Sequence, residues 1–466
     1  MEVDGGSESE AISFEKHSPG PSSAVPRSDK DLPDTWTLVE QDEPLFSLLH
    51  QALCASPFVQ SVRQRKEVLD KNTRRSSVFD SASSSRGDRD FRNRGVAPFV
   101  GSLPTALSRR MLSPLGRHPD NYLCFPKSDG ERFFLVSARS PTGERILTLQ
   151  ARNGNLFVSE RARERKVSSE LLVEDVLDGE LLQEEIHPEK SHPLLDPPPP
   201  FSQWVFAVFD ALMINGQDCS GRAYQERLES ARHRLESAFL GFGTLHHPWG
   251  CNPPESPGMC LYVKRSTPGS HVHELLDHIH QIPPSEQGLE NTFEDQGFVF
   301  TSDGFLVLPQ WFLWDEVRRS RQAVDGMVLC PARLPYYPGH LDDIILKWKP
   351  PDMHTCDLFL LENNLPPAPG PPTFCLSILE GEGLSCIRNT YSDPLRISHT
   401  LQELCNHVVE CLYSEKHGDW LIVRVRKDKI RPNFFTTAME ALQCRLENIQ
   451  EEDLLEAMGR GNQGNQ

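Results

Sequence analysis

The sequence predicts an α+β protein, with a first domain of mainly antiparallel sheets, a small OB-like β-barrel domain and a C-terminal helix. Between residues 96 and 350, short strand-like runs alternate with turns, without regular helices between them; this pattern is typical of antiparallel sheets. A second group of strand-like runs follows Pro350 and suits an OB-like barrel. Apolar residues then recur at three- and four-residue spacing from Phe435 to Ile449, which predicts the closing helix.

Length, charge and cysteine use limit the possible classes of protein. The 466 residues can form two domains, and the formal net charge is −18, so contact with nucleic acid would depend on a local basic strip. The 12 cysteines form no C-x-x-C pair and no secretory signal precedes them, which favours a reduced intracellular setting. Every apolar run is shorter than 18 residues, so we expect no membrane span.

The N-terminal part divides into two segments. Residues 1–40 are acidic and rich in Ser and Pro, so we expect them to be disordered. Residues 41–95 combine an apolar segment, Pro44–Val62, which reads as helical, with a basic, Ser-rich stretch, Arg63–Arg94. That stretch is either a solvated insert, a contact for RNA or a nuclear address.

The first domain is expected over residues 96–350. Its strand-like runs are Tyr122–Phe125, Phe133–Val136, Trp204–Phe209, Met259–Lys264, Met327–Leu329 and Ile344–Lys347. Residues 281–321 read as an insertion, in which Gly-Phe-Val-Phe and Gly-Phe-Leu-Val-Leu form a possible hairpin.

The second domain, with the closing helix, is expected over residues 351–458. Its strand-like runs are Asp357–Leu361, Phe374–Leu379, Val408–Tyr413 and Trp420–Val425. Asn433, or Thr437 together with Glu440, is a candidate cap for the closing helix. Residues 459–466 are expected to be a disordered tail.

The strongest chemical signal is the K-x-D-G-x-R element that begins at Lys127. A lysine amine is a nucleophile only when it is uncharged, and neighbouring cations or desolvation favour that form. Asp129 belongs to this element, its glycine permits a tight turn, and Arg132 can make a two-pronged contact with ribose or phosphate. Taken alone, the element also fits a surface turn with a solvated lysine.

Further elements recur in order along the chain. They are Leu177-Asp178-Gly179-Glu180, Phe206-Ala207-Val208-Phe209-Asp210, Val324-Asp325-Gly326-Met327-Val328, Ile345-Leu346-Lys347-Trp348-Lys349-Pro350 and the segment from Trp420 to Lys429. With these elements and Pro98–Pro104, the chain from about Val96 to Leu455 resembles the cellular mRNA capping guanylyltransferases. That family belongs to the covalent lysyl-nucleotidyltransferase superfamily, which also contains the DNA and RNA ligases.

The resemblance implies a nucleotidyltransferase domain that binds GTP and is followed by an OB-fold domain. It implies that Lys127 attacks the α-phosphate of GTP, releases pyrophosphate and carries GMP, which then passes to a 5′-diphosphate RNA end to form the mRNA cap. Both half-reactions are displacements at phosphorus, so positioning and charge neutralisation would supply most of the catalysis.

The resemblance and the residue types together suggest individual roles. Lys347 and Lys349 lie two apart on a strand, so both can face the α-phosphate, although a solvated strand edge is the alternative. Asp325 and Glu180 suit Mg²⁺ (or Mn²⁺) held through phosphate oxygens; Glu180 can equally bind ribose, and either residue can cap a turn. Phe209 would stack on guanine unless it is an ordinary core residue.

Residues of the second domain would act when that domain closes over bound GTP. The resemblance places Arg424, Arg426, Asp428 and Lys429 near the leaving pyrophosphate, with Asp357 as a secondary candidate. Two family features are harder to match. Glu160-Arg161 stands where an aspartate and arginine are usual, and Lys264 is the candidate to read the guanine oxygen.

The resemblance also implies partners and a location. No His-Cys-x5-Arg signature is present, so a separate RNA triphosphatase and a separate cap methyltransferase are expected. The C-terminal tail of RNA polymerase II is a further candidate partner, and the implied location is the nucleus. Two alternative functions stay open: an ATP-dependent polynucleotide ligase, and a non-catalytic module that binds RNA ends.

Overall fold

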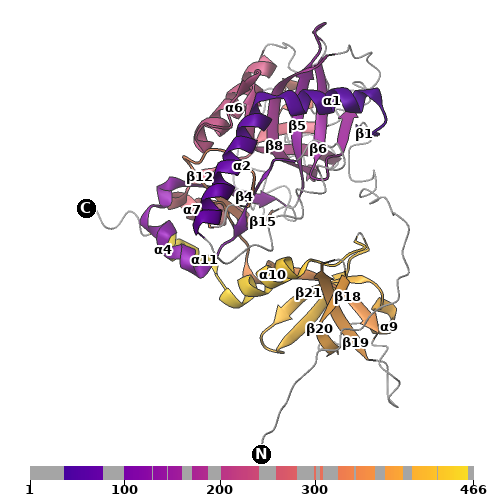
Figure 1. Ribbon diagram of the computed structural model, residues 1–466. Helices are drawn as coiled ribbons and strands as arrows, with labels where there is room; N and C mark the ends of the chain where they lie inside the picture. The colour runs from indigo at the N-terminus through magenta and orange to yellow at the C-terminus, as the bar shows by residue number, and fades with distance from the viewer. Residues whose placement is uncertain are drawn as a thin grey trace, which may run out of the picture.

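The computed structural model describes most of the chain as two units joined side by side (Figure 1). The described residues are 36–76, 99–128, 130–143, 145–159, 170–186, 201–240, 259–280, 299–300, 305–307, 324–340, 343–362, 373–381, 383–391, 401–427 and 429–459. The expected disorder of the first 35 residues and of the final tail therefore lies outside the described residues. Among the helices that the structure describes, none is long and apolar enough to cross a lipid bilayer.

The larger unit contains a ten-stranded sheet in the order β1-β7-β6-β5-β8-β9-β11-β14-β13, with β10 paired to β9. Most neighbours are antiparallel, but β11 is parallel to both β9 and β14. The strands are β1 (Trp36–Val39), β5 (Glu131–Arg139), β6 (Arg145–Ala151), β7 (Leu156–Ser159), β8 (Leu172–Ile186), β9 (Phe201–Ile214), β10 (Gln217–Asp218), β11 (Met259–Val263), β13 (Val299–Phe300) and β14 (Phe305–Val307).

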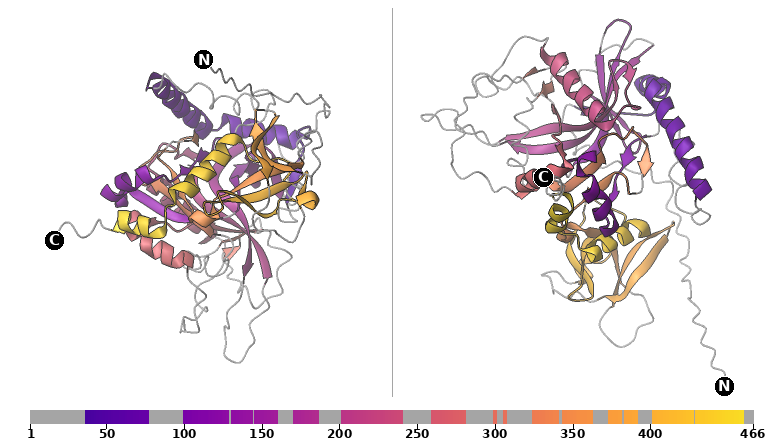
Figure 2. Two further views of the ribbon diagram at one scale, coloured as in Figure 1. Left: turned by 90° about the horizontal axis from the view of Figure 1, so that it is seen from below. Right: turned by 90° about the vertical axis from the view of Figure 1, so that its left-hand side faces the viewer.

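Both faces of this sheet are buried, which explains why its strands read as continuous apolar runs. On β5, Phe133 and Leu135 point to one face, whereas Phe134 and Val136 point to the other. The first face packs on α6 (Tyr224–Leu240) and the second on α1 (Pro44–Ala55) and α2 (Pro57–Ser76). Figure 2 shows α1 and α2 on the side of the sheet away from α6.

A second, five-stranded sheet in the order β12-β4-β15-β17-β3 lies beside the first, next to a short β16-β2 pair. Its core joins the strands to α4 (Arg109–Arg117) and α7 (Val272–His280) through Leu115, Val272 and Trp348. The strands are β2 (Ser102–Leu103), β3 (Thr105–Ala106), β4 (Tyr122–Ser128), β12 (Thr267–Pro268), β15 (Val324–Pro331), β16 (Gly339–His340) and β17 (Leu346–Trp348).

The smaller unit is a five-stranded sheet in the order β20-β19-β18-β21-β22. Its first strand is central and pairs with both the second and the fourth strand, an order that fits the OB type. The elements are β18 (Thr355–Glu362), β19 (Phe374–Glu380), β20 (Gly383–Tyr391), α9 (Leu401–Leu404), β21 (Val408–Ser414) and β22 (Asp419–Val425). The predicted α+β fold with a second, OB-type domain is thus confirmed.

The chain ends in two helices instead of the single helix predicted. α10 (Phe435–Glu447) ends where Asn448 adopts a left-handed conformation, with φ 48°, and α11 (Glu451–Gly459) follows. The predicted apolar face is only partly buried, because Phe435 and Leu446 are 46% and 53% exposed. The predicted caps are also wrong, since Phe434 occupies the N-cap position and makes no side-chain cap.

The last helix returns to the larger unit. Leu454 and Met458 of α11 are fully buried in the core that contains Leu115 of α4, and the views in Figure 2 show α11 beside α4. The chain therefore crosses between the units twice, once after Lys349 and once after Glu447. Residues 351–458 do not form a separate body, because α11 packs with the first domain.

Each predicted strand-like run coincides with a strand, although the run predicted from Ile344 begins only at Leu346, and β13 and β14 form the hairpin expected within residues 281–321. Two expectations need correction. Residues Trp36–Val39 form β1 on β7, because Trp36 and Val39 bury their side chains there. The prediction that disorder extends to residue 40 is therefore wrong for these four residues. α6 is a regular 17-residue helix within a region expected to lack one.

Candidate active site

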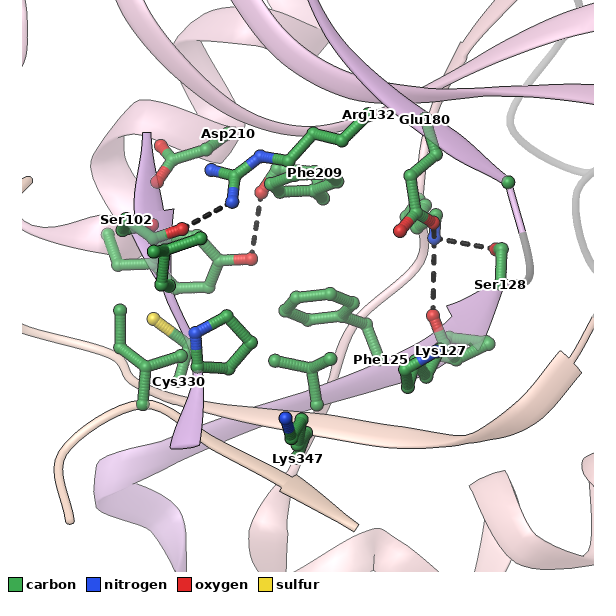
Figure 3. A pocket seen from close by; sticks show the side chains of 18 of the residues that line it. Ser102, Phe125, Lys127, Ser128, Arg132, Glu180, Phe209, Asp210, Cys330 and Lys347 are labelled. Atoms are coloured by element: carbon green, nitrogen blue, oxygen red, sulfur yellow. Dashed lines mark hydrogen bonds and ion pairs between the residues drawn. The ribbon is translucent and has the colours of Figure 1, made fainter. Parts of the chain in front are cut away.

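A pocket opens where the two sheets of the larger unit meet (Figure 3). The first sheet contributes Arg132 from β5, Glu180 from β8 and Phe209 from β9. The second sheet contributes the end of β4, including Lys127, and Lys347 from β17. Five residues predicted to act at one site are therefore brought together from five strands.

Lys127 lies on strand β4, where its amine donates a hydrogen bond to Oδ1 of Asp325 at 2.7 Å. Asp325 lies on β15 at a register shift. Val324 pairs with Ser128 and Gly326 pairs with Lys127, so Asp325 is the extra residue between them. Gly326 has φ 153°, and a Cβ there would meet the Trp348 carbonyl oxygen at 2.0 Å. Glycine is thus required next to the carboxylate, and the bulge aims Asp325 at the amine.

The two phosphate-binding candidates from the Lys-Trp-Lys element have different partners. Lys349 forms an ion pair with Oδ2 of Asp325, so one carboxylate joins it to Lys127. Lys347 lines the pocket but pairs with Glu440 of α10 at 3.3 Å. The sequence predicted that cations surround Lys127. The structure also places a carboxylate there, because Asp325 pairs with both Lys127 and Lys349.

In the pocket, the buried Lys264 pairs with the partly buried Glu180. The Lys264 ammonium is 2.7 Å from Glu180, donates to Ser128 Oγ at 2.6 Å and lies 3.3 Å from the Pro126 carbonyl oxygen. Burial lowers the pKa of Lys264, and the charge of Glu180 opposes this. All three ammonium protons are engaged, so Lys264 must release a partner before it can read a guanine oxygen.

Arg132 lines the pocket, and its guanidinium is held by neighbouring protein groups. Its guanidinium makes a bidentate pair with Asp178 at 2.8 and 2.5 Å and also donates to the Ser102 carbonyl oxygen. Burial acts to lower the pKa of Arg132, but the charge and hydrogen bonds of Asp178 outweigh it and raise that pKa above its usual value. Arg132 therefore joins β5 to the middle of β8 as a structural ion pair.

The Leu-Asp-Gly-Glu element that contains Asp178 lies in the middle of the 15-residue β8. A Cβ at Gly179 would meet the Phe206 ring at 2.6 Å, so glycine allows β8 and β9 to approach closely here.

Phe209 lies in the pocket as predicted, and a second aromatic ring faces it. The rings of Phe209 and Phe125 are parallel to within 8°, with centroids 6.1 Å apart. Both residues line the pocket, and Figure 3 shows the two rings one above the other. This arrangement provides a flat apolar slot suited to a planar base.

The candidates in the smaller unit form their own ionic cluster away from the pocket lining. Asp357 is buried and pairs with Arg426 at 3.0 Å and with Lys429. Arg424 is largely exposed and pairs with Glu410. Asp428 and Asp129 lie outside the described residues, as does the Glu160-Arg161 pair.

Three residues of the site were not found from the sequence. Arg152, in the turn after β6, lines the pocket. The sequence search looked for an arginine that directly follows an acidic residue, as in Glu160-Arg161. Arg152 follows Ala151 and was therefore missed. Phe125 stands two residues before Lys127 on the same strand, a spacing that places both on one face. Glu440 reaches the site only because α10 packs back on β3 and β17.

The acidic residues fit a metal only together with a nucleotide. Among the described residues, no group of three or more His, Cys, Asp or Glu side chains is arranged to hold a metal ion. Asp325 and Glu180 each pair already with lysine. Mg²⁺ is commonly held by one or two carboxylates plus substrate phosphates, so these residues suit an ion that arrives with the triphosphate.

An antiparallel α+β unit with a lysine-lined pocket, joined to an OB-type unit, defines the class of two-domain nucleotidyltransferases. Residues 373–455 match the family described as the mRNA capping enzyme C-terminal domain. The mRNA-capping enzyme subunit alpha of Schizosaccharomyces pombe is 25% identical over 382 residues, covering 78% of this chain and 81% of that protein. The subunit of the same name from Saccharomyces cerevisiae is 22% identical over 409 residues, covering 78% of each. The chain is therefore similar to the mRNA-capping enzymes over most of its length.

Among solved structures, mycobacterial DNA ligase D complexed with ATP and MES aligns with a TM-score of 0.31 and 16% identity. That alignment covers 72% of this chain and 96% of the ligase chain.

Proposed function

We propose that this chain is an mRNA guanylyltransferase, which moves GMP from GTP to Lys127 and then to the 5′-diphosphate end of RNA. The observation that carries the proposal is the position of the Lys127 amine. It lies in the pocket between the two sheets, beside Asp325 and Lys349 and close to an aromatic slot. The relationship to mRNA-capping enzymes supports the same activity.

The first half-reaction forms a bond between Lys127 Nζ and the α-phosphorus of GTP and breaks the bond from that phosphorus to the bridging oxygen, so that pyrophosphate leaves. The ammonium group loses one proton to solvent to become a nucleophilic amine, and it loses a second as the bond to phosphorus forms. Asp325 Oδ1, 2.7 Å away, is the group placed to accept the second proton. Lys349, on the other oxygen of Asp325, compensates the negative charge that the phosphate brings.

In the second half-reaction, a terminal phosphate oxygen of the RNA attacks the same phosphorus. The phosphoramidate bond then breaks, and the Lys127 nitrogen regains a proton as it returns to the free amine. The product carries a 5′-5′ triphosphate bridge. Because both steps use one phosphorus, the two substrates must enter in turn.

The acidic side chains Asp325 and Glu180 would hold Mg²⁺ or Mn²⁺, which would neutralise charge on the phosphates as the bond to pyrophosphate breaks. Release of Lys264 from Glu180 would free one ammonium proton for the guanine oxygen. Arg152, at the pocket rim, is suited to ribose or phosphate.

The smaller unit would act by closing over the nucleotide. Arg426 and Lys429 are held together by Asp357, so they would approach the pyrophosphate as one cationic group, with Arg424 and Asp428 nearby. The two crossings of the chain between the units are where such a motion would bend.

The wider setting follows from this activity. A separate RNA triphosphatase would supply the 5′-diphosphate end, and a separate methyltransferase would modify the product. The enzyme would act in the nucleus, where the RNA polymerase II tail is a candidate docking partner.

The aromatic slot yields a prediction for Phe125. A base between two rings needs about 6.8 Å, twice the stacking rise of about 3.4 Å, so the slot must open slightly from its 6.1 Å centroid separation. We expect Phe125→Leu to weaken GTP binding about fivefold or more, because stacking on an aromatic ring is worth about 1–3 kcal/mol. Equilibrium binding of α,β-methylene GTP measures this loss.

A control variant distinguishes the loss of base stacking in the slot from a general loss of core packing. Phe157 is equally buried in the same core but does not line the pocket, so Phe157→Leu should leave binding unchanged. Inorganic tripolyphosphate has no base and should bind both variants equally. Equal loss of tripolyphosphate binding in Phe125→Leu would contradict the assignment.

The test of the proposed function compares two labelled nucleotides. Protein incubated with Mg²⁺ and α-labelled GTP should acquire an acid-labile label, whereas α-labelled ATP should give little. Stronger labelling from ATP would favour a polynucleotide ligase. Absence of label from either nucleotide would favour a non-catalytic module.

A further inference from the structure

Glu440 connects the smaller unit to the pocket. It lies on α10, and its Oε1 accepts the backbone N–H of Ala106 at 3.1 Å. The same oxygen lies 3.3 Å from the Lys347 ammonium. Ala106 and Lys347 are register partners on the neighbouring strands β3 and β17, so Glu440 sits across the edge of the sheet that carries the phosphate-binding candidates.

Lys347 depends on this carboxylate for charge compensation. Within the part of the chain that the structure describes, Glu440 is the carboxylate that pairs with Lys347, whereas Lys127 and Lys349 share Asp325. The Lys347 and Glu440 side chains are 31% and 40% exposed. A partly exposed ion pair of this kind is weak enough for a phosphate group to replace it.

Contacts other than that of Glu440 also hold α10 in place. Arg445 pairs with Asp352 at 2.5 Å, and Arg109 donates to the Glu447 and Asn448 carbonyl oxygens at 2.6 and 2.9 Å. The Trp348 indole donates to the Ile449 carbonyl oxygen at 2.9 Å. Loss of the Glu440 charge should therefore leave the helix in place and change only its contact with the pocket.

We propose that Glu440 is a positioning residue that holds the Lys347 ammonium and competes with nucleotide phosphate for it. When a phosphate binds Lys347, Glu440 loses its ionic contact with the first domain, while the other contacts of α10 remain. The proposal rests on the proposed function in that Lys347 must bind phosphate.

The test uses the full chain with Glu440→Gln, which removes the charge but keeps an oxygen for the Ala106 N–H. The probes are α,β-methylene GTP and inorganic tripolyphosphate, because neither can transfer GMP to the enzyme. We expect both to bind Glu440→Gln about two- to fivefold more tightly, the range that exposed ion pairs span. Unchanged or weaker binding would overturn the proposal.

Two further variants separate competition for Lys347 from a general effect of charge. Glu447 lies on the same helix and contacts Arg109 instead of the pocket, so Glu447→Gln should leave binding unchanged. In a Lys347→Met background, Glu440→Gln should no longer tighten binding. Equal tightening in Glu447→Gln, or persistence of the gain without Lys347, would show that Glu440 does not act through that lysine.

These outcomes differ from failure of the proposed function. Tripolyphosphate binding reports on Lys347 and Glu440 whether or not GMP becomes attached to the protein. If the wild-type protein formed no GMP adduct, the function would fail. The competition at Lys347 would still be decided by the binding measurements.

Discussion

Replacing Lys127 with Ala is expected to abolish attachment of GMP to the protein while leaving it folded. The reaction needs a nucleophilic nitrogen at this point of the pocket, and the other lysines that line the pocket extend from different positions: Lys264 directly follows β11, and Lys347 lies on β17. Asp325 keeps Lys349 as an ion-pair partner, so removal of the Lys127 amine leaves no carboxylate without a counter-ion and the protein should stay folded. Labelling with α-labelled GTP, beside a thermal unfolding curve, measures both effects.

The matched control is Lys416→Ala, which removes an exposed lysine from the turn between β21 and β22. That variant should label like the wild type. Label that persisted in a folded Lys127→Ala protein would mean that another residue carries the nucleotide.

The largest expected effect on stability comes from Asp178. Its carboxylate is fully buried and holds Arg132 and the Tyr336 hydroxyl. Asp178→Ala would leave the Arg132 charge buried without its counter-ion, so we expect a loss of about 3–5 kcal/mol in the free energy of unfolding. Urea denaturation followed by circular dichroism measures the change.

An exposed ion pair provides the comparison. Asp343 pairs with Arg110 on the surface and has φ 59°, a conformation that Asn tolerates. Asp343→Asn should therefore cost less than about 1 kcal/mol. If Asp178→Ala cost no more than Asp343→Asn, the buried pair would not have the structural role assigned to it.

The sequence was sufficient to predict the strands and the two-domain order because these depend on local patterns. Runs such as Phe206-Ala207-Val208 are apolar on both faces and lie between the covering helices in the fold. The helical spacing of Tyr224, Leu228, Ala231 and Leu235 is also present in the sequence, but α6 was not recognised because a charged residue follows nearly every apolar one. The turn at Asn448 was missed because the apolar spacing continues through it to Ile449.

The motifs in the sequence predicted which residues form the site. They did not predict several of the side chains with which those residues pair. Lys127, Asp325 and Glu180 could be placed together because each belongs to a local element with recognisable chemistry. The partner of Arg132 depends on the register between β5 and β8, and the partner of Lys347 depends on how α10 packs. Neither partner is encoded in a short stretch of sequence, so the ion pair of Arg132 with Asp178 and the contact of Lys347 with Glu440 were not anticipated.

The most direct measurement is the intact mass of the full chain after incubation with GTP and Mg²⁺, followed by peptide mapping under conditions that preserve phosphoramidates. We expect the mass to increase by one GMP, and the modified peptide to be the one that contains Lys127. An unchanged mass, or a GMP found on a different residue, would contradict the assignment of this pocket as the site of covalent nucleotidyl transfer.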